Sequence, residues 1–128
     1  MNIKEAPPIT TITDEALANL IIDSIQDIKG KRIVKLDLRQ LEHAPTNYFI
    51  ICEGESNTQV RAISQNINRR IKDELGLMPN HSEGLLDSKW ILVDYFDLVV
   101  HIFYPETRTF YDLENLWSDA EISAYEDL

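Results

Sequence analysis

The residues with the clearest potential for chemistry lie together in segment 93–103, which reads VDYFDLVVHIF. His101 stands in an otherwise apolar predicted strand, and Asp94 and Asp97 lie at the turn that leads into it. A histidine beside a carboxylate can act as a general base when a nucleophile is within hydrogen-bond reach. The segment therefore raises three possibilities: a catalytic group, a recognition surface, or ordinary parts of a buried sheet.

The best candidate nucleophile is Cys52, the only cysteine in the chain. It lies in the apolar run FIICE, where we predict a strand that is buried on both faces. Burial in apolar surroundings raises the pKa of a thiol and leaves it inert. A catalytic Cys–His pair is therefore disfavoured, and the simpler interpretation of His101 is a partly buried histidine that hydrogen-bonds a neighbour.

Metal and phosphate binding also have little support in the sequence. The three histidines, His43, His81 and His101, are far apart and lack the spacing of a zinc site. The turn at residues 54–56 precedes a predicted helix, but the sequence has neither a G-x-G-x-x-G run nor a P-loop lysine. We therefore expect a helix-capping turn here, and we predict no metal, no cofactor and no catalytic residue.

Aromatic residues are concentrated in one part of the chain. Eight of the eleven aromatics fall within residues 90–117, and Asp94, Asp97, Asp112 and Glu114 lie close to them in the sequence. Tryptophan and tyrosine often anchor protein interfaces, and an acidic border would suit a basic protein. A core cluster with a few exposed edges explains the same pattern, so both interpretations stay open at this point.

Composition limits the classes of partner. The 128 residues include 12 basic and 22 acidic side chains, a net charge of −10. A phosphate backbone repels such a chain overall, so we expect no sequence-specific nucleic-acid binding. The best basic patch lies on one predicted helix and consists of Arg61, Arg69, Arg70 and Lys72. No Lys or Arg follows Arg108, and this acidic end suits either a basic protein partner or a solvated, disordered tail.

The sequence also bears on location. No apolar run approaches the roughly 18 residues of a membrane span, so we expect no contact with a membrane. The N-terminus lacks the features of a targeting signal. A single cysteine allows no intrachain disulfide and fits a reducing compartment. We therefore expect a soluble cytoplasmic protein.

The periodicity of apolar residues predicts a single α/β domain with a mixed sheet of about five strands and helices packed on it. Residues 1–12 read as an extended arm, residues 13–118 as the domain, and residues 119–128 as an acidic tail. Thr13 and Ser56 are predicted helix caps. Successive elements are a helix at 13–29, strands at 31–38 and 47–54, a helix at 56–75, a short strand within 77–88, a hairpin at 90–104 and a helix at 111–117.

Several motifs together resemble one known family. The run WILVDYxDLVVHIF occupies residues 90–103, and FYDLExLW occupies residues 110–117. Upstream, LDLR, NYFIICEGES and PNHSEG follow the same order at residues 36–39, 47–56 and 79–84. These motifs are similar to those of the Iojap, or ribosomal silencing factor (RsfS), family, and the resemblance covers about residues 13–118.

The resemblance implies a fold like that of nucleotidyltransferases without the catalytic machinery, and no D-x-D pair for Mg²⁺ occurs in this chain. It implies a non-enzyme that binds the large ribosomal subunit at large-subunit protein fourteen, blocks joining of the small subunit and represses translation when nutrients are scarce. Family members also assist or accompany late large-subunit assembly and often crystallise as homodimers, so a homodimer of the free protein is expected. An assembly factor, an enzyme on this fold and a plain dimerisation module stay open as alternatives.

The resemblance also implies which residues contact the partner. We expect a partner-binding surface made of family positions, which are Trp90, Asp94, Tyr95, Asp97, His101, Phe103, Tyr111, Asp112, Leu113, Glu114 and Trp117. Phe96 departs from the family, whose members often have glycine in this hairpin turn, and the local geometry of the turn is therefore expected to differ.

Overall fold

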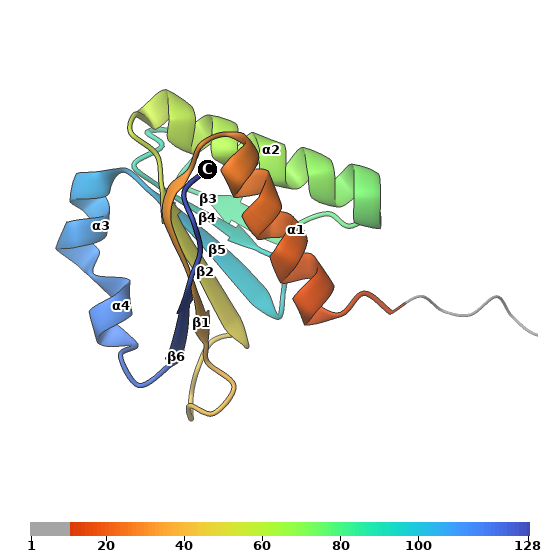
Figure 1. Cartoon of the computed structure of the whole chain (residues 1–128), viewed down its shortest axis with the longest axis vertical. Coiled ribbons are helices and arrows are strands. Elements are labelled where there is room, and N and C mark those ends of the chain that lie inside the picture. The colour runs from red at the N-terminus through yellow and green to blue at the C-terminus, as the bar shows by residue number, and fades with distance from the viewer. Residues whose placement is uncertain (1–10) are drawn as a thin grey trace, which may run out of the picture.

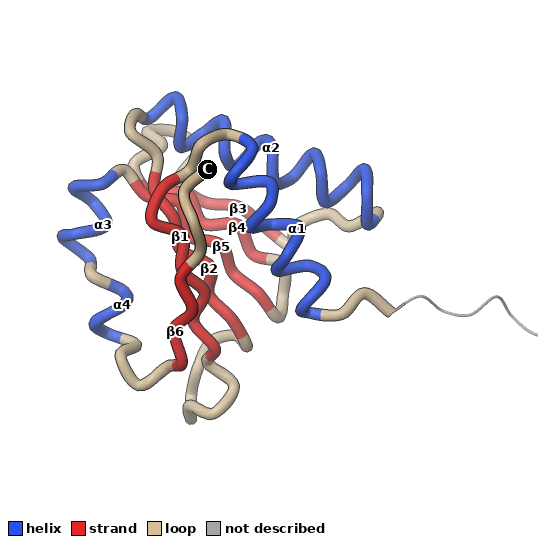
Figure 2. Tube along the Cα trace, in the orientation of Figure 1, coloured by secondary structure: helices blue, strands red, loops and turns tan. Residues whose placement is uncertain are grey.

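The computed structural model describes residues 11–128, so the predicted arm at 1–12 lies almost wholly outside the described residues. Within these residues, one six-stranded sheet has the order β3-β4-β5-β2-β1-β6, accompanied by two long and two short helices (Figures 1 and 2). The elements are α1 (Asp14–Asp27), β1 (Lys31–Asp37), β2 (Tyr48–Glu53), α2 (Asn57–Leu75), β3 (His81–Glu83), β4 (Trp90–Asp94), β5 (Leu98–Phe103), α3 (Pro105–Tyr111), α4 (Leu113–Leu116) and β6 (Glu121–Ala124).

The sheet is mixed, as predicted. Strands β2 and β5 pair in parallel, whereas the other neighbouring strands pair antiparallel. The predicted hairpin is confirmed as β4 and β5, in which Leu92 lies opposite His101. Helices α1 and α2 pack on one face of the sheet, and α3 and α4 lie on the other side (Figure 1). We call these the helix-covered face and the open face.

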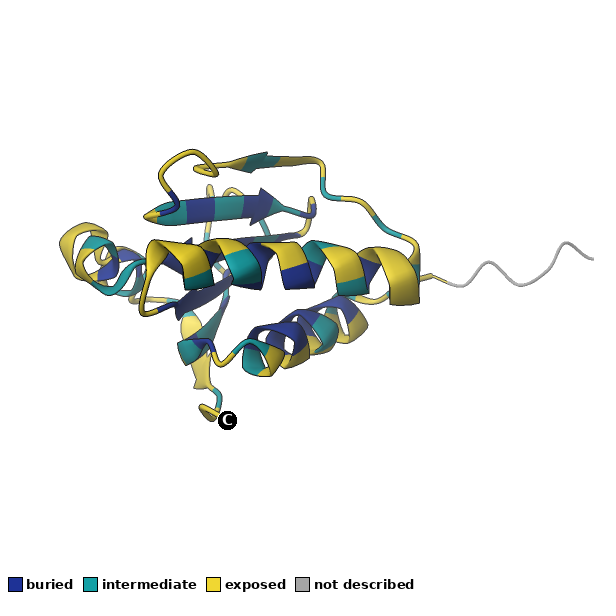
Figure 3. Cartoon of the chain, turned by 90° about the horizontal axis from the view of Figure 1, so that it is seen from above, coloured by how far each residue is buried: buried dark blue, intermediate teal, exposed yellow. Residues whose placement is uncertain are grey.

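Both long helices form where the sequence predicts them because their ends are capped. The hydroxyl of Thr13 accepts a bond from Ala16 N–H at 3.0 Å, and that of Ser56 accepts one from Gln59 N–H at 3.1 Å. Gly76 ends α2 with a left-handed φ of 68°. Figure 3 shows α2 buried toward the sheet and exposed on its outer side, as its 3.6-residue apolar period requires.

The predicted acidic tail at residues 119–128 is wrong, because β6 lies within it. Its four residues pair antiparallel with β1, and this strand makes the sheet six-stranded instead of five-stranded. Tyr125 N–H also donates to the Ile33 carbonyl at 2.9 Å, and Asp127 accepts a bond from Arg32 N–H at 2.9 Å. The free backbone groups at the outer edge of β1 supply the pairing, which residue patterns within the tail do not reveal.

The predicted helix at 111–117 is also only partly correct. Pro105 ends the preceding strand as expected, but it also begins α3, since proline is well suited to the first turn of a helix. Asp112 then adopts a φ of 48° and separates α3 from the single turn of α4. The expected range therefore contains only α4 and the last residue of α3, and most of α3 lies before it.

Candidate protein-docking surface

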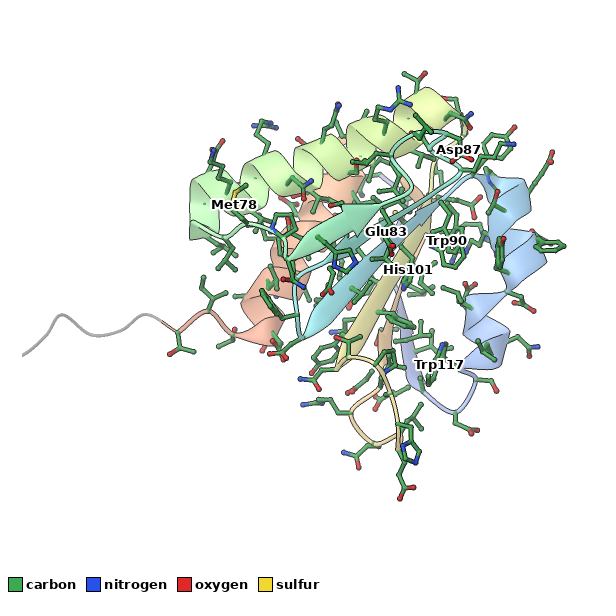
Figure 4. All side chains as sticks on the ribbon, turned by 180° about the vertical axis from the view of Figure 1, so that it is seen from behind. Met78, Glu83, Asp87, Trp90, His101 and Trp117 are labelled. Carbon is green, nitrogen blue, oxygen red and sulfur yellow. The ribbon has the colours of Figure 1, made fainter. Side chains whose placement is uncertain are left out.

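The open face of the sheet gathers the aromatic residues. Along β5, side chains alternate between the two faces, so Val99, His101 and Phe103 lie on the open face and their neighbours lie in the helix-covered core. Trp90 reaches this face from β4, and Trp117 approaches it from the end of α4 (Figure 4). The chain thus places aromatic groups from distant segments on one surface.

Trp90 fixes the orientation and the tautomer of the His101 ring. Its indole Nε1–H donates to Nδ1 of the imidazole at 3.1 Å, so Nδ1 is an acceptor and the neutral ring carries its proton on Nε2. Burial lowers the pKa of His101 to about 4. Among the residues that the structure describes, Nε2 has no hydrogen-bond partner. His101 therefore presents an unpaired donor and is held neutral.

The geometry argues against a catalytic Cys–His pair. Cys52 lies opposite Ile102 in the parallel β2–β5 ladder, whereas His101 lies opposite Ile51. The two side chains therefore point to opposite faces of the sheet. Burial also raises the pKa of the thiol to about 12. Within residues 11–128, neither Asp94 nor Asp97 is hydrogen-bonded to the imidazole.

Aromatic contacts link the core to the surface in a continuous cluster. The Trp90 ring lies 5.0 Å from Phe103 and 4.7 Å from Tyr111, and Phe49 lies 4.5 Å from His101. Phe49 and Phe103 are buried, Trp90 is partly buried, and Tyr111 is 50% exposed. The aromatic cluster therefore belongs to the core at one end and faces solvent at the other, and its role as an interface stays a prediction.

Two hollows open on this surface. The aromatic hollow, of about 440 Å³, lies between β4 and α3 and is lined by Asp87, Lys89, Trp90, Glu106, Thr107, Phe110 and Tyr111. The hairpin groove, of about 290 Å³, lies over β3, β4 and β5 and is lined by Pro45, Phe49, His81, Glu83, Leu92, Asp94, Phe96, Val99 and His101. Trp90 lines the aromatic hollow, and His101, to which it is hydrogen-bonded, lines the hairpin groove.

Most of the predicted site residues lie on this side of the sheet. Trp90, His101, Phe103 and Tyr111 form the aromatic cluster. Leu113 and Trp117 pack beside them, but Leu113 is buried. Tyr95 does not join them: it lies in the helix-covered core, and its hydroxyl donates to Oδ1 of Asn68 at 2.8 Å. Strand alternation from Trp90 through Leu92 and Asp94 could have placed Tyr95 on the opposite face.

The predicted acidic residues have different environments. Asp94 is partly buried and accepts a bond from Phe96 N–H at 2.7 Å. Asp97 and Asp112 are exposed. Glu114 is partly buried, with one oxygen 3.4 Å from Nε of Arg108. Of these four carboxylates, Asp97 and Asp112 are exposed, whereas Asp94 and Glu114 are partly buried.

Sequence reasoning missed the residues that hold α3 against the sheet. Arg108 is buried, and its Nη1 donates to the Glu53 carboxylate at 3.1 Å and to the Arg32 carbonyl at 2.8 Å. Glu53 is also buried, at the end of β2. Arg108 lies between Pro105 and the aromatic pair Phe110-Tyr111, and no local sequence pattern there predicts burial. The one available signal was that Arg108 is the last basic residue of the chain.

Two general features bear on the class of site. Within the described part of the chain, no group of three or more His, Cys, Asp or Glu side chains is placed to hold a metal ion. Among the same residues, no helix has both the length and the apolar character needed to cross a membrane.

Comparisons with known proteins identify the family. A family model described as "Ribosomal silencing factor during starvation" matches residues 11–128. The chain is 39% identical over 106 residues to the "Ribosomal silencing factor RsfS" of Chromobacterium violaceum, and the match covers 80% of this chain and 83% of that protein. It is 32% identical over 75 residues to the mouse "Mitochondrial assembly of ribosomal large subunit protein 1", over 57% of this chain and 33% of that protein.

A solved structure agrees with the fold. The crystal structure of a Chromobacterium violaceum protein superposes with a TM-score of 0.79 at 36% identity, and the match covers 84% of this chain and 88% of that one. The family match extends over every described residue, including the C-terminal strand β6. The chain therefore belongs to the ribosomal silencing factor family.

Proposed function

We propose that this protein represses translation by binding the large ribosomal subunit at large-subunit protein fourteen and blocking its association with the small subunit. The observation that carries the proposal is the open face, where the aromatic cluster reaches solvent through Tyr111 and Phe110, which is 80% exposed. Exposed aromatics beside hollows of this kind are typical of protein-docking surfaces. The mechanism needs no covalent step, because occupying the shared surface is sufficient.

Electrostatics favour a basic protein over nucleic acid as the direct partner. The net charge is −10, and the basic residues predicted as a patch on α2 are largely engaged within the molecule. Arg70 bonds Asp23, Asp27 and Glu74 at 2.7 to 2.8 Å. Arg61 donates to the Ser88 hydroxyl at 3.1 Å. The remaining field would attract a basic ribosomal protein and discourage contact with RNA phosphates.

We also propose that the protein is not an enzyme. Its relatives are named for silencing and assembly, not for a reaction. Cys52 and His101 point to opposite faces of the sheet. The turn before α2 presents Glu55 and Ser56 without the carboxylate pair that metal-dependent phosphoryl transfer requires. From the family resemblance we further propose a cytoplasmic location and a homodimer when the protein is free.

A second candidate function is assistance in large-subunit assembly. The observation that favours it is the name of the mouse relative, which refers to assembly of the ribosomal large subunit. Both functions need the same first step, attachment to the large subunit. They differ in whether the attached protein still permits joining of the small subunit.

The test is sedimentation of the purified full chain with separated ribosomal subunits, followed by addition of the missing subunit. Silencing predicts binding to the large subunit alone and a loss of joined ribosomes. Binding without loss of joining would support assembly instead. Failure to bind the large subunit would overturn both candidates.

A pair of charge reversals tests the proposed surface. Asp97 is exposed at the hairpin turn of β4 and β5, and Asp73 is exposed on α2. We expect Asp97→Lys to weaken large-subunit binding about threefold to tenfold at low salt, because a rim charge chiefly changes the association rate. Asp73→Lys makes the same change in net charge away from the open face. Equal loss of binding in the two variants would contradict docking through this face.

A further inference from the structure

The tip of the β4–β5 hairpin holds a large aromatic residue in a backbone conformation that favours glycine. Phe96 has a φ of 74°, in the left-handed region that residues with a Cβ rarely adopt. Its side chain is also 67% exposed. The backbone conformation costs folding free energy, and the ring gains little from burial, so glycine would avoid the backbone cost at little loss of packing. Folding alone therefore gives no reason for phenylalanine at this position.

The turn is held by bonds that do not involve the Phe96 ring. Its N–H donates to Oδ1 of Asp94 at 2.7 Å, and its carbonyl accepts from the Thr46 hydroxyl at 2.9 Å. Asp97 N–H donates to the Tyr95 carbonyl at 3.1 Å and closes a three-residue turn around Phe96. None of these bonds uses a side-chain atom of residue 96, so they would persist in a glycine variant. The ring is presented outward from a fixed backbone.

Phe96 lines the hairpin groove, whose chemistry indicates the kind of group that would fill it. Leu92 and Val99 supply apolar surface from the sheet, and the His101 ring, with its unpaired Nε2 donor, lies among them. The charged groups of the lining are Glu83 and Asp94, and the lining includes no Lys or Arg. At about 290 Å³, the groove lies at the small end of the ~300–1,000 Å³ range of ligand pockets and suits side chains of a protein.

We propose that Phe96 is an anchor residue for a basic protein partner that docks in the hairpin groove. An apolar side chain of the partner packs against the Phe96 ring, and a neighbouring Lys or Arg meets Glu83 and Asp94. Aromatic faces and carboxylates together favour such a mixed apolar and cationic group. The inference rests on the proposed ribosomal function, and it adds the residue that fixes the partner at the β3 to β5 side of the sheet.

The test compares variants at Phe96 with a control at another exposed apolar residue. Phe96→Gly removes both the strain and the ring. We expect the thermal midpoint of this variant to rise by roughly 3–5 °C, while its affinity for large ribosomal subunits falls roughly tenfold. Phe96→Trp keeps an aromatic ring and should retain affinity within about twofold. Leu86→Ala, at a side chain that is 96% exposed outside the groove, should leave affinity unchanged.

Each outcome separates the inference from the function on which it rests. A more stable Phe96→Gly that binds weakly, with binding kept in Phe96→Trp, supports the anchor role. Wild-type binding together with unchanged binding of Phe96→Gly would overturn the inference and leave the proposed function intact. A Phe96→Gly that is less stable than wild type would show a structural role for the ring and would also overturn it. If wild-type protein binds no large subunits, both proposals fail together.

Discussion

The two faces of the sheet differ in the kind of side chain they carry and in how completely helices cover them. The helix-covered face is closed by α1 and α2, and its core is built almost entirely of aliphatic side chains such as Ile21, Ile63 and Val100, with no exposed surface. The open face is aromatic, carries a buried imidazole with an unpaired nitrogen, and is covered by α3 and α4 over only part of its area. We infer that one face supplies stability and that the other gives up some stability to keep a surface available.

The largest effect should come from the ion pair that attaches α3 to the open face. Arg108→Ala would leave Glu53 buried without its main partner, which typically costs about 3–5 kcal/mol. Urea denaturation of the variant measures the free energy of unfolding. Arg108→Ala combined with Glu53→Gln should recover part of the loss, because the uncompensated charge is then absent. A loss below about 1 kcal/mol would show that α3 is held by its apolar contacts instead.

On the helix-covered face, loss of packing should be costly without altering the docking surface. Ile63 is completely buried between α2 and the sheet, and Ile63→Ala is expected to lower the free energy of unfolding by about 3 kcal/mol. The folded fraction should still bind large subunits with wild-type affinity. A reduced affinity of folded Ile63→Ala would contradict the separation of the two faces.

Acid should destabilise the protein through the open face. The pKa of His101 is about 4 in the folded chain against 6.5 for an ordinary histidine, so the unfolded chain binds the proton more tightly. The stabilisation that comes from keeping His101 neutral is therefore present above about pH 6.5 and is lost as the pH falls toward 4. We expect the free energy of unfolding to fall by about 2 kcal/mol between pH 7 and pH 5. On the other face, burial raises the pKa values of Cys52 and Tyr95, and both groups stay neutral over this range.

Denaturation curves at pH 7 and pH 5 measure this loss. His81, Glu83 and Asp94 share the groove with His101, so a variant is needed to assign the effect. His101→Gln removes the titrating ring, and its stability should change much less between the two pH values. The same pH dependence in wild type and variant would assign the effect to other groups.

The contrast between the faces also explains which features the sequence could predict. The helix-covered face consists of periodic elements, so apolar spacing and caps at Thr13 and Ser56 located α1, α2 and the strands. Strand β6 was missed because Glu121–Ala124 is only four residues long and exposed throughout, and its pairing depends on the free edge of β1. The open face depends on contacts between distant segments, such as Arg108 with Glu53, which local patterns do not encode.

The candidate site shows the same division. The motif at residues 90–103 located Trp90 and His101, but it could not show that Trp90 donates to Nδ1 and leaves Nε2 unpaired. It also placed Tyr95 with the site, although alternation in β4 directs that ring into the helix-covered core. A motif shows that a residue occupies a family position, but the face of the sheet to which its side chain points depends on its place in the strand.

The smallest change in stability should accompany a large change in binding. Tyr111 is half exposed, packs on Trp90 at the rim of the aromatic hollow and has no hydrogen bond from its hydroxyl among the described residues. We expect Tyr111→Ala to lower the free energy of unfolding by about 1 kcal/mol or less and to weaken large-subunit binding about tenfold or more. Tyr111→Phe should bind nearly as well as wild type, because the ring provides the contact. Comparable losses in stability and in binding for Tyr111→Ala would mean that the open face is an extension of the core, and the division of labour between the two faces would not hold.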